Sequence, residues 1–313
     1  MLGKTAGGLY WMFRGLERAE NTARLIEAGF RIALTRSTDP ASDWRSIIVA
    51  AAQKQGFDAR HLEYTSQNVS DYLLREPSNP SSVLSVIKAA RDNARLVRTA
   101  LTTEVWIAVN ETWMVLTDLL KTPVSEADLP QTLEAIRHQS ALVRGALHGT
   151  MLRNDPYNFC RLGTFIERAD STARIVNVKY HALLPSPSFV GSRLDNVQWE
   201  MILRSVSAHR SFRHAFDDDF NAASIAEFLL LDERFPRSLA FCACNITSNL
   251  AALCPTGGEE SGSLKAARAL QARLQHRDIG SIFEDGLHEF ISQSIIDIAD
   301  IGTRIEQEYR FIS

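Results

Sequence analysis

The chain has 313 residues, of which 45% are apolar and 23% are charged. This composition is that of a folded protein with a substantial buried core, and it excludes an intrinsically disordered chain. The formal net charge is -3 at pH 7, so no overall basic field exists to hold nucleic acid or an anionic membrane, and neither is an expected partner.

The N-terminal residues lack the continuous apolar stretch of a signal peptide, and no apolar run approaches the length of a membrane span. The 4 cysteines are too few for a disulfide scaffold in a chain of this size. Cys242 and Cys244 would lie on different sides of a helix, so they cannot share a metal. We therefore expect a cytoplasmic protein with reduced thiols, no metal and no cofactor.

Helical periodicity is present along the whole chain. Apolar residues recur every three or four positions over residues 9–30, which predicts a long opening helix. The helices expected after it are a long, bent one over residues 79–121, one over 125–149, and one that begins at Asp155. Residues 185–192 are the clearest loop. Because alternating strand patterns are absent, the predicted fold class is all-α.

Three segments of the first half return in the same order in the second half. Residues 17–25 (ERAENTARL) match 167–175 (ERADSTARI), residues 43–47 match 198–202, and residues 71–83 match 227–239. This order indicates an internal duplication. We predict one domain, residues 1–313, built as an elongated helical bundle. Its two multi-helix units, approximately residues 5–150 and 155–313, would be related by a pseudo-two-fold axis.

The repeated motif places its charged residues on one face of a helix, opposite the apolar stripe. A solvated face with ion pairs such as Glu20–Arg24 is one interpretation. However, six of the eight positions 17–24 are identical in the second copy, whereas a solvated face tolerates most substitutions. The alternative is a partly buried ionic network in which the Glu17 and Glu167 helices face each other. Such a network would either fix the helix register or bind a ligand.

A second charged stripe lies on the predicted helix 79–121. Its members, at helical spacing, are Lys88, Arg91, Arg95 and Arg98. Like charges at this spacing repel unless carboxylates or an anion offset them. Three interpretations stay open: ion pairs with Glu17, Glu20 and Glu167, an anionic ligand held by arginine forks, or a docking surface for an acidic partner. The matching positions of the second half are uncharged, so any such site would be single.

The familiar catalytic signatures are missing from the sequence. It has no Gly-rich phosphate loop, no Gly-x-Ser-x-Gly elbow and no His-Glu-x-x-His. The nearest approach to a helical di-iron pattern is the single pair Asp285 and His288. The sequence therefore shows no nucleotide-binding or catalytic motif of a familiar type.

Taken together, these motifs resemble the Alpha-E family, an all-helical bacterial family. The resemblance rests on residues 9–11 leading into 17–24, on 79–82, on 90–98 and on 228–238. It covers nearly the whole chain, with the motifs in the family's order. One departure is visible: the family usually has a Gly-Arg-aromatic step before Glu-Arg-Ala, whereas this chain reads Phe13-Arg14-Gly15. Arg14 itself is kept.

The resemblance implies association with a circularly permuted ATP-grasp ligase, and often with a transglutaminase-like peptidase, in systems that make and trim amide bonds. It favours a non-catalytic helical partner subunit whose Glu/Arg residues hold the bundle or bind an anionic part of the substrate. The alternatives are a stand-alone enzyme, with Glu17 and Glu167 as acid and base on a carboxylate-bearing substrate, and a purely structural network. The candidate ligand-binding residues are Arg14, Glu20, Arg24, Arg91, Arg95, Arg98, Asp170 and Arg174.

Overall fold

The structure is a computed structural model, and it describes the chain except for residues 35–39, 61, 183–192, 217–219, 256–258 and 312–313. The described residues form helices and no strand, which confirms the all-α class. The predicted loop 185–192 lies outside the described residues. Within the described part of the chain, no helix is both long enough and apolar enough to cross a membrane.

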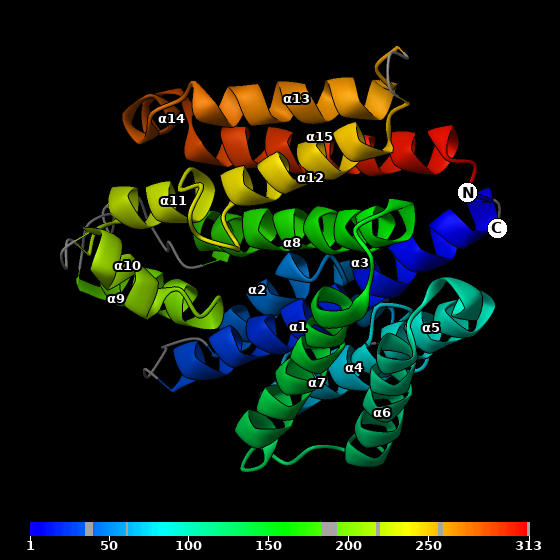
Figure 1. Cartoon of the computed structure of the whole chain (residues 1–313). Helices are drawn as coiled ribbons and strands as arrows, with labels where there is room; N and C mark the ends of the chain where they lie inside the picture. Colours follow the sequence, from blue (N-terminus) through cyan, green and yellow to red (C-terminus); the bar gives the residue numbers. More distant parts are fainter. Residues whose placement is uncertain (35–39, 61, 183–192, 217–219, 256–258, 312–313) are drawn as a thin grey trace.

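Two long helices that carry the repeated motif lie side by side at the centre, α1 (Gly3–Ala33) and α8 (Asp155–Ala182) (Figure 1). The predicted apolar stripe of α1 is buried, with Leu9 and Ile26 fully inaccessible to solvent. The two backbones approach closely at Gly163, where an added Cβ would lie 2.2 Å from the backbone oxygen of Tyr10. Only glycine permits this approach, which brings the charged faces of α1 and α8 within reach of each other.

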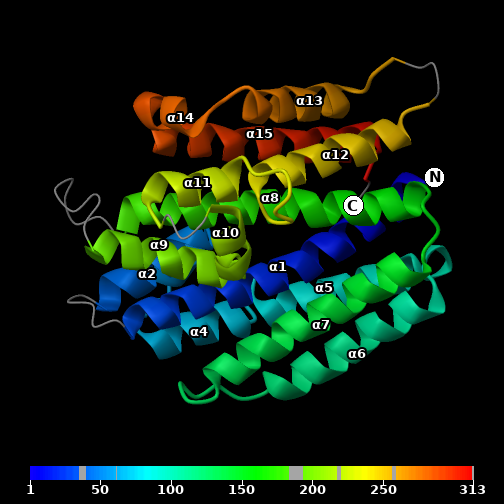
Figure 2. The same cartoon turned by 60° about the vertical axis from the view of Figure 1, so that its left-hand side comes forward.

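The remaining helices form layers on either side of this central pair (Figure 2). On one side lie α4 (Ser66–Leu74), α5 (Val83–Leu96), α6 (Thr103–Leu119) and α7 (Leu129–Thr150). On the other side lie α11 (Ala222–Leu230), α12 (Leu239–Leu253), α13 (Gly262–Gln275), α14 (Ile279–Asp285) and α15 (Leu287–Glu308). Helices α5 and α7 pack on α1, and α12 and α15 pack on α8.

Two further groups of helices cross between the halves. They are α2 (Pro40–Ala50) with α3 (Lys54–Asp58), and α9 (Arg193–Ser205) with α10 (His209–Phe216). Helix α2 of the first half packs on α8, and α9 of the second half packs on α1. Each central helix is therefore covered by elements of both halves.

The matching segments 79–82 and 235–238 have the same local structure. Ser82 and Ser238 are the N-caps of α5 and α12, and each hydroxyl accepts a hydrogen bond from the backbone N–H three residues later. The same two backbone hydrogen bonds precede both caps. The predicted helix start at 79–82 is confirmed, because a serine in extended conformation satisfies the free N–H groups of the first turn.

The predicted continuous helix over 79–121 is wrong. The segment contains α5, a short 3₁₀ turn η1 (Arg98–Ala100) and α6. The chain is extended at Leu101 and Thr102, and the Thr102 hydroxyl accepts from the backbone N–H of Val105 at 3.4 Å. A threonine cap offers the backbone an alternative to continuing the helix. It lets α6 fold back and pack against α5.

Candidate functional site

The Glu-Arg pairs of the two motifs are bonded across the central helix pair. Arg18 donates from Nε and Nη2 to Glu167 at 2.6 and 2.8 Å. Arg168 donates from the same atoms to Glu17 at 2.9 and 2.8 Å. Glu17 and Glu167 are only 2% and 5% exposed. These crossed, two-pronged pairs confirm the prediction that the charged faces of the helices lie inside the bundle.

On one side of the crossed Glu–Arg pairs between α1 and α8, further arginines surround Glu17 and Glu20. We call this group the Glu17 cluster; its members are Glu17, Glu20, Asn21, Arg24, Arg144, Arg168 and Arg237. Arg237 lies at its centre and donates to Glu17 at 3.0 Å, to the Asn21 side-chain oxygen at 2.9 Å, and to Glu20. Arg144 of α7 and Arg24 of α1 donate to Glu20 at 2.7 and 2.8 Å.

The arginines keep the carboxyl groups of the Glu17 cluster ionised. Burial alone would raise the pKa of Glu17, but the positive charges of Arg168 and Arg237 outweigh burial and hold that pKa well below its usual range. The pKa of Glu20 is lowered in the same way, against burial, chiefly by Arg237. Burial lowers the pKa of Arg237 itself to about 10, although Glu17 opposes this change. A carboxyl group with a depressed pKa is a poor general acid near neutral pH.

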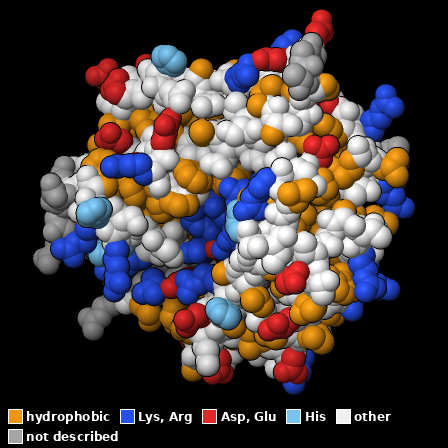
Figure 3. Space-filling view, in the orientation of Figure 1, with side chains coloured by type: hydrophobic (Ala, Val, Ile, Leu, Met, Phe, Trp, Pro, Cys, Tyr) orange, Lys and Arg blue, Asp and Glu red, His pale blue; other side chains and the backbone are white. Residues whose placement is uncertain are grey.

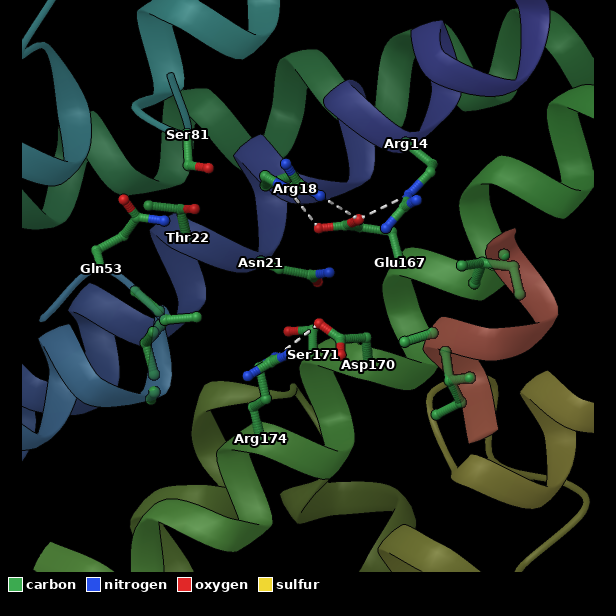
Figure 4. A pocket seen from close by; sticks show the side chains of 18 of the residues that line it. Arg14, Arg18, Asn21, Thr22, Gln53, Ser81, Glu167, Asp170, Ser171 and Arg174 are labelled. Carbon is green, nitrogen blue, oxygen red and sulfur yellow. Dashed lines mark hydrogen bonds and ion pairs between the residues drawn. The ribbon is translucent and has the colours of Figure 1, made fainter. Parts of the chain in front are cut away.

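On the other side of the crossing lies a cavity of about 390 Å³, which we call the Glu167 pocket. It is enclosed by α1, α8 and α15, with an edge formed by the segment after α2 and by Ser81 (Figure 4). Its polar lining consists of Arg14, Arg18, Asn21, Thr22, Gln53, Ser81, Glu167, Asp170, Ser171, Arg174, Thr303 and Glu306. The pocket therefore joins the motif residues of both helices to the last helix of the chain.

Two carboxylates, each with its arginine partners, define the charge distribution inside this pocket: Glu167 with Arg14 and Arg18, and Asp170 with Arg174. Besides Arg18, Arg14 donates from Nε to Glu167 at 3.1 Å, and its guanidinium lies 4.7 Å from the centre of the Trp11 ring. Burial would raise the pKa of Glu167, but Arg18 and Arg14 outweigh it and lower that pKa. Arg174 donates from Nε to Asp170 at 2.7 Å, and their side chains are 33% and 23% exposed. This second pair therefore stands at the solvent-accessible mouth of the pocket.

One polar group in the pocket wall has an unused hydrogen-bonding atom. Asn21 is 5% exposed, and its Nδ2 has no hydrogen-bond partner among the described residues. Figure 4 shows the Asn21 amide pointing into the space between Glu167 on one side and Asp170 and Ser171 on the other. A buried N–H donor without a partner costs free energy, so the pocket favours a molecule with an acceptor at this point.

The arginine stripe of α5 and η1 does not reach the motif carboxylates. Arg91 donates to the Asn110 side chain at 3.0 Å, Arg95 and Arg98 are exposed, and Arg98 lies over the Trp106 ring at 5.1 Å. The expectation of ion pairs between this stripe and Glu17, Glu20 or Glu167 is therefore wrong. The physical reason is the orientation of α5. Its apolar face, which includes Ala90 and Ala94, is turned toward the core, so the arginines on its other faces point away from the motif carboxylates.

The pocket and the cluster bring together most of the candidate residues. Arg14, Asp170 and Arg174 line the Glu167 pocket, and Glu20 and Arg24 belong to the Glu17 cluster. The sequence-based list did not include four further arginines that bind the carboxylates: Arg18, Arg144, Arg168 and Arg237. Three of them carried a signal, since Arg18 and Arg168 are part of the repeated motif and Arg237 lies in the matching segment 227–239. Arg144 carried none.

A further polar group lies near the end of α7. The His148 ring bonds Arg161 through Nε2 at 2.8 Å and Tyr157 through Nδ1 at 2.9 Å. Burial, helped by Arg161, lowers the pKa of His148 to about 4. Since a guanidinium only donates, Nε2 is the acceptor and the ring is neutral.

Figure 3 shows Lys and Arg side chains gathered around a hollow near the centre of the face that carries α7, α8 and α12.

The comparisons with known proteins agree with this helical architecture. A family described as "a predicted alpha-helical domain with a conserved ER motif" matches residues 1–309. Curated proteins similar to this chain include the uncharacterized proteins Mb2597 of Mycobacterium bovis and Rv2567 of Mycobacterium tuberculosis. Each is 22% identical over 335 aligned residues, which cover 94% of this chain and 36% of the relative. The chain thus spans about a third of the length of these relatives. No solved structure matches it.

Proposed function

The chain belongs to the Alpha-E family, and from this membership and the geometry of the Glu167 pocket we propose that it is a non-catalytic partner subunit of an ATP-grasp-type amide ligase. The link to the ligase comes from the resemblance of its motifs to those of the family. A transglutaminase-like peptidase would be a further member of the same system. The mycobacterial relatives extend well beyond the matched region, as expected if this helical unit is fused to other components in some proteins.

One observation carries the proposal. Glu17 and Glu167 are each held by a two-pronged arginine, while beside them a pocket of about 390 Å³ presents the unpartnered Asn21 amide. The first feature suits a rigid frame and the second suits a bound molecule. The pocket would hold an acceptor group of the substrate, such as a carboxylate or carbonyl oxygen, at Asn21 Nδ2, near the arginines that line the pocket. The chain would thereby position an anionic part of the substrate for the ligase.

The alternative, a stand-alone enzyme with Glu17 and Glu167 as acid and base, has less support. Both carboxyl groups have pKa values below the ordinary range because arginines bind them. A general acid or base that works near neutral pH needs the opposite shift. Both carboxylates also already accept two hydrogen bonds from one guanidinium, which hold their oxygens in place.

We also propose that the two halves are duplicated units, approximately residues 5–150 and 155–313, related by a pseudo-two-fold axis between α1 and α8. The crossed Glu–Arg pairs support this, since each motif binds the other in the same way. The packing supports it too: α5, α7 and α9 on α1 correspond to α12, α15 and α2 on α8. The repeated serine caps are the third observation.

Co-expression with an ATP-grasp protein encoded next to this chain tests the function. We expect a complex that survives gel filtration, no ATP hydrolysis by the isolated chain, and faster amide formation by the ligase when the chain is present. Asn21→Ala should weaken that stimulation, because it removes the donor in the pocket. Asn110→Ala, which changes an amide bonded to Arg91 outside the pocket, should not. ATP turnover by the chain alone, or no complex, would contradict the proposal.

A further inference from the structure

Arg237 and Ser81 occupy corresponding places in the two halves. Arg237 precedes the serine cap of α12, as Ser81 precedes the serine cap of α5, and the surrounding backbone hydrogen bonds are the same. Thr172 of α8 donates to the backbone oxygen of Arg237 at 2.8 Å. Its counterpart Thr22 on α1 stands beside Ser81 at the edge of the Glu167 pocket (Figure 4). The two segments thus occupy corresponding places along the chain and beside the central helices, although, within the described part of the chain, no hydrogen bond joins Thr22 to Ser81 as one joins Thr172 to Arg237.

The side-chain partners of Arg237 also have counterparts in the pocket. Arg237 binds Glu17, Glu20 and Asn21. The residues at the matching motif positions, Glu167, Asp170 and Ser171, all line the pocket together with Ser81. Three of these four pocket residues are shorter than their counterparts: aspartate for glutamate, serine for asparagine and serine for arginine. The pocket therefore contains the place that the Arg237 guanidinium occupies in the Glu17 cluster.

The balance of charges also differs between the Glu17 cluster and the Glu167 pocket, because the cluster holds more arginines per carboxylate. In the Glu17 cluster, four arginines (Arg24, Arg144, Arg168 and Arg237) surround two carboxylates. The Glu167 pocket is lined by three arginines and by three carboxyl groups, Glu167, Asp170 and Glu306. Where α7 contributes Arg144 to the cluster, α15 presents Ala299 and Gly302 to the pocket, and the guanidinium beside Gly302 is that of Arg14 on α1. The pocket thus has room for positive charge that the other side already holds.

We propose that the Glu167 pocket binds the cationic head of its ligand, a guanidinium or ammonium group, between Glu167, Asp170 and Ser171 where Arg237 stands in the other half. This inference deepens the proposed function and rests on it. With an acceptor group at the Asn21 amide and a cation at the carboxylates, the ligand is zwitterionic. Its class is that of an amino acid or a short peptide with a free amino or guanidino group, which is also a suitable substrate for an amide ligase.

The first test supplies the cation within the chain. Ser81→Arg should place a guanidinium in the pocket, whereas Ser81→Met adds a side chain of similar reach without charge. We expect the melting temperature of Ser81→Arg to exceed that of Ser81→Met by about 2 °C or more. The difference should shrink when Asp170→Asn is introduced into both variants, since the double-mutant cycle isolates the contact. Equal melting temperatures, or a difference that Asp170→Asn leaves unchanged, would overturn the inference.

The second test uses three matched probes and calorimetry on the full chain. They are 4-guanidinobutyrate, which carries both charges, 4-ureidobutyrate, which has the same shape without the cation, and butylguanidine, which has only the cation. We expect 4-guanidinobutyrate to bind about tenfold more tightly than 4-ureidobutyrate. Ser81→Arg should remove this preference, because its own guanidinium fills the place, and Ser81→Ala should keep it. Equal binding of the guanidino and ureido probes would contradict the cation site.

The outcomes separate this inference from the proposed function. If the ligase complex forms but Ser81→Arg is no more stable than Ser81→Met, the cation site alone fails. If no complex forms while the charge-dependent effects at Ser81 and Asp170 are observed, the partner role fails and the cation site stands. If the chain binds the probes only within the complex, the stability comparison on the isolated chain still decides.

Discussion

Removal of the Glu17 charge is the most direct test of the buried network. Glu17→Gln keeps the shape of the side chain but leaves three arginines, Arg144, Arg168 and Arg237, facing a neutral amide. Arg168 and Arg237 are only 8% and 9% exposed, so water cannot replace the lost charge. Removing one partner of a buried ion pair costs about 3–5 kcal/mol, because the remaining charge stays in the interior.

That cost can be converted into a change in melting temperature. The unfolding entropy is about 2.1 cal/mol/K per residue, which for 313 residues gives roughly 0.66 kcal/mol/K. A loss of 3–5 kcal/mol then lowers the melting temperature by roughly 5–8 °C. Glu167→Gln should cost less, because one of its partners, Arg18, is 31% exposed and can be hydrated.

Differential scanning calorimetry of the full chain measures these shifts. Asp300→Asn is the matched control, because Asp300 pairs with Arg304 on the surface, where both side chains are nearly half exposed. An exposed, hydrated pair of this kind contributes little to stability, so the control should move the melting temperature by about 1 °C or less. A shift for Glu17→Gln no larger than that of Asp300→Asn would refute the buried-network argument.

Two further predictions follow from the charges and from the close approach of the central helices. The pKa values of Glu17, Glu20 and Glu167 are lowered in the folded state. Their ionised carboxylates therefore stabilise the fold above about pH 4.3, the pKa of a glutamate in the unfolded chain. This contribution is lost as the pH falls through the lower pKa values of the folded state. The urea midpoint should therefore fall steadily below about pH 4.3, and a midpoint constant from pH 6 to pH 3 would contradict this. Gly163→Ala should destabilise the fold by about 1–3 kcal/mol, because the new methyl group meets the backbone of α1. Gly145→Ala, at a helical position with open space around it, should instead stabilise by about 0.5–1 kcal/mol; urea unfolding of both variants compares them, and equal signs would contradict the close packing.

The sequence alone was sufficient for the local features of this protein. The apolar stripe of α1 predicted a buried helix, and the segment 79–82 predicted the start of α5, because both depend on spacing and capping within a few residues. The near identity of residues 17–24 and 167–174 also predicted that their charges lie inside the bundle. A solvated face would have allowed more change, whereas each buried charge requires a partner.

The tertiary structure decided which charges meet. Helical spacing shows that Arg91, Arg95 and Arg98 share a face, but the rotation of α5 against α1 determines that this face lies away from the motif. The same limit applies to Arg144, which reaches Glu20 only because α7 packs on α1. The Glu167 pocket is a further example, because its lining comes from helices as far apart in the sequence as α1, α8 and α15. Periodicity fixes which residues are neighbours on one helix, whereas the contacts between helices depend on packing across long sequence separations.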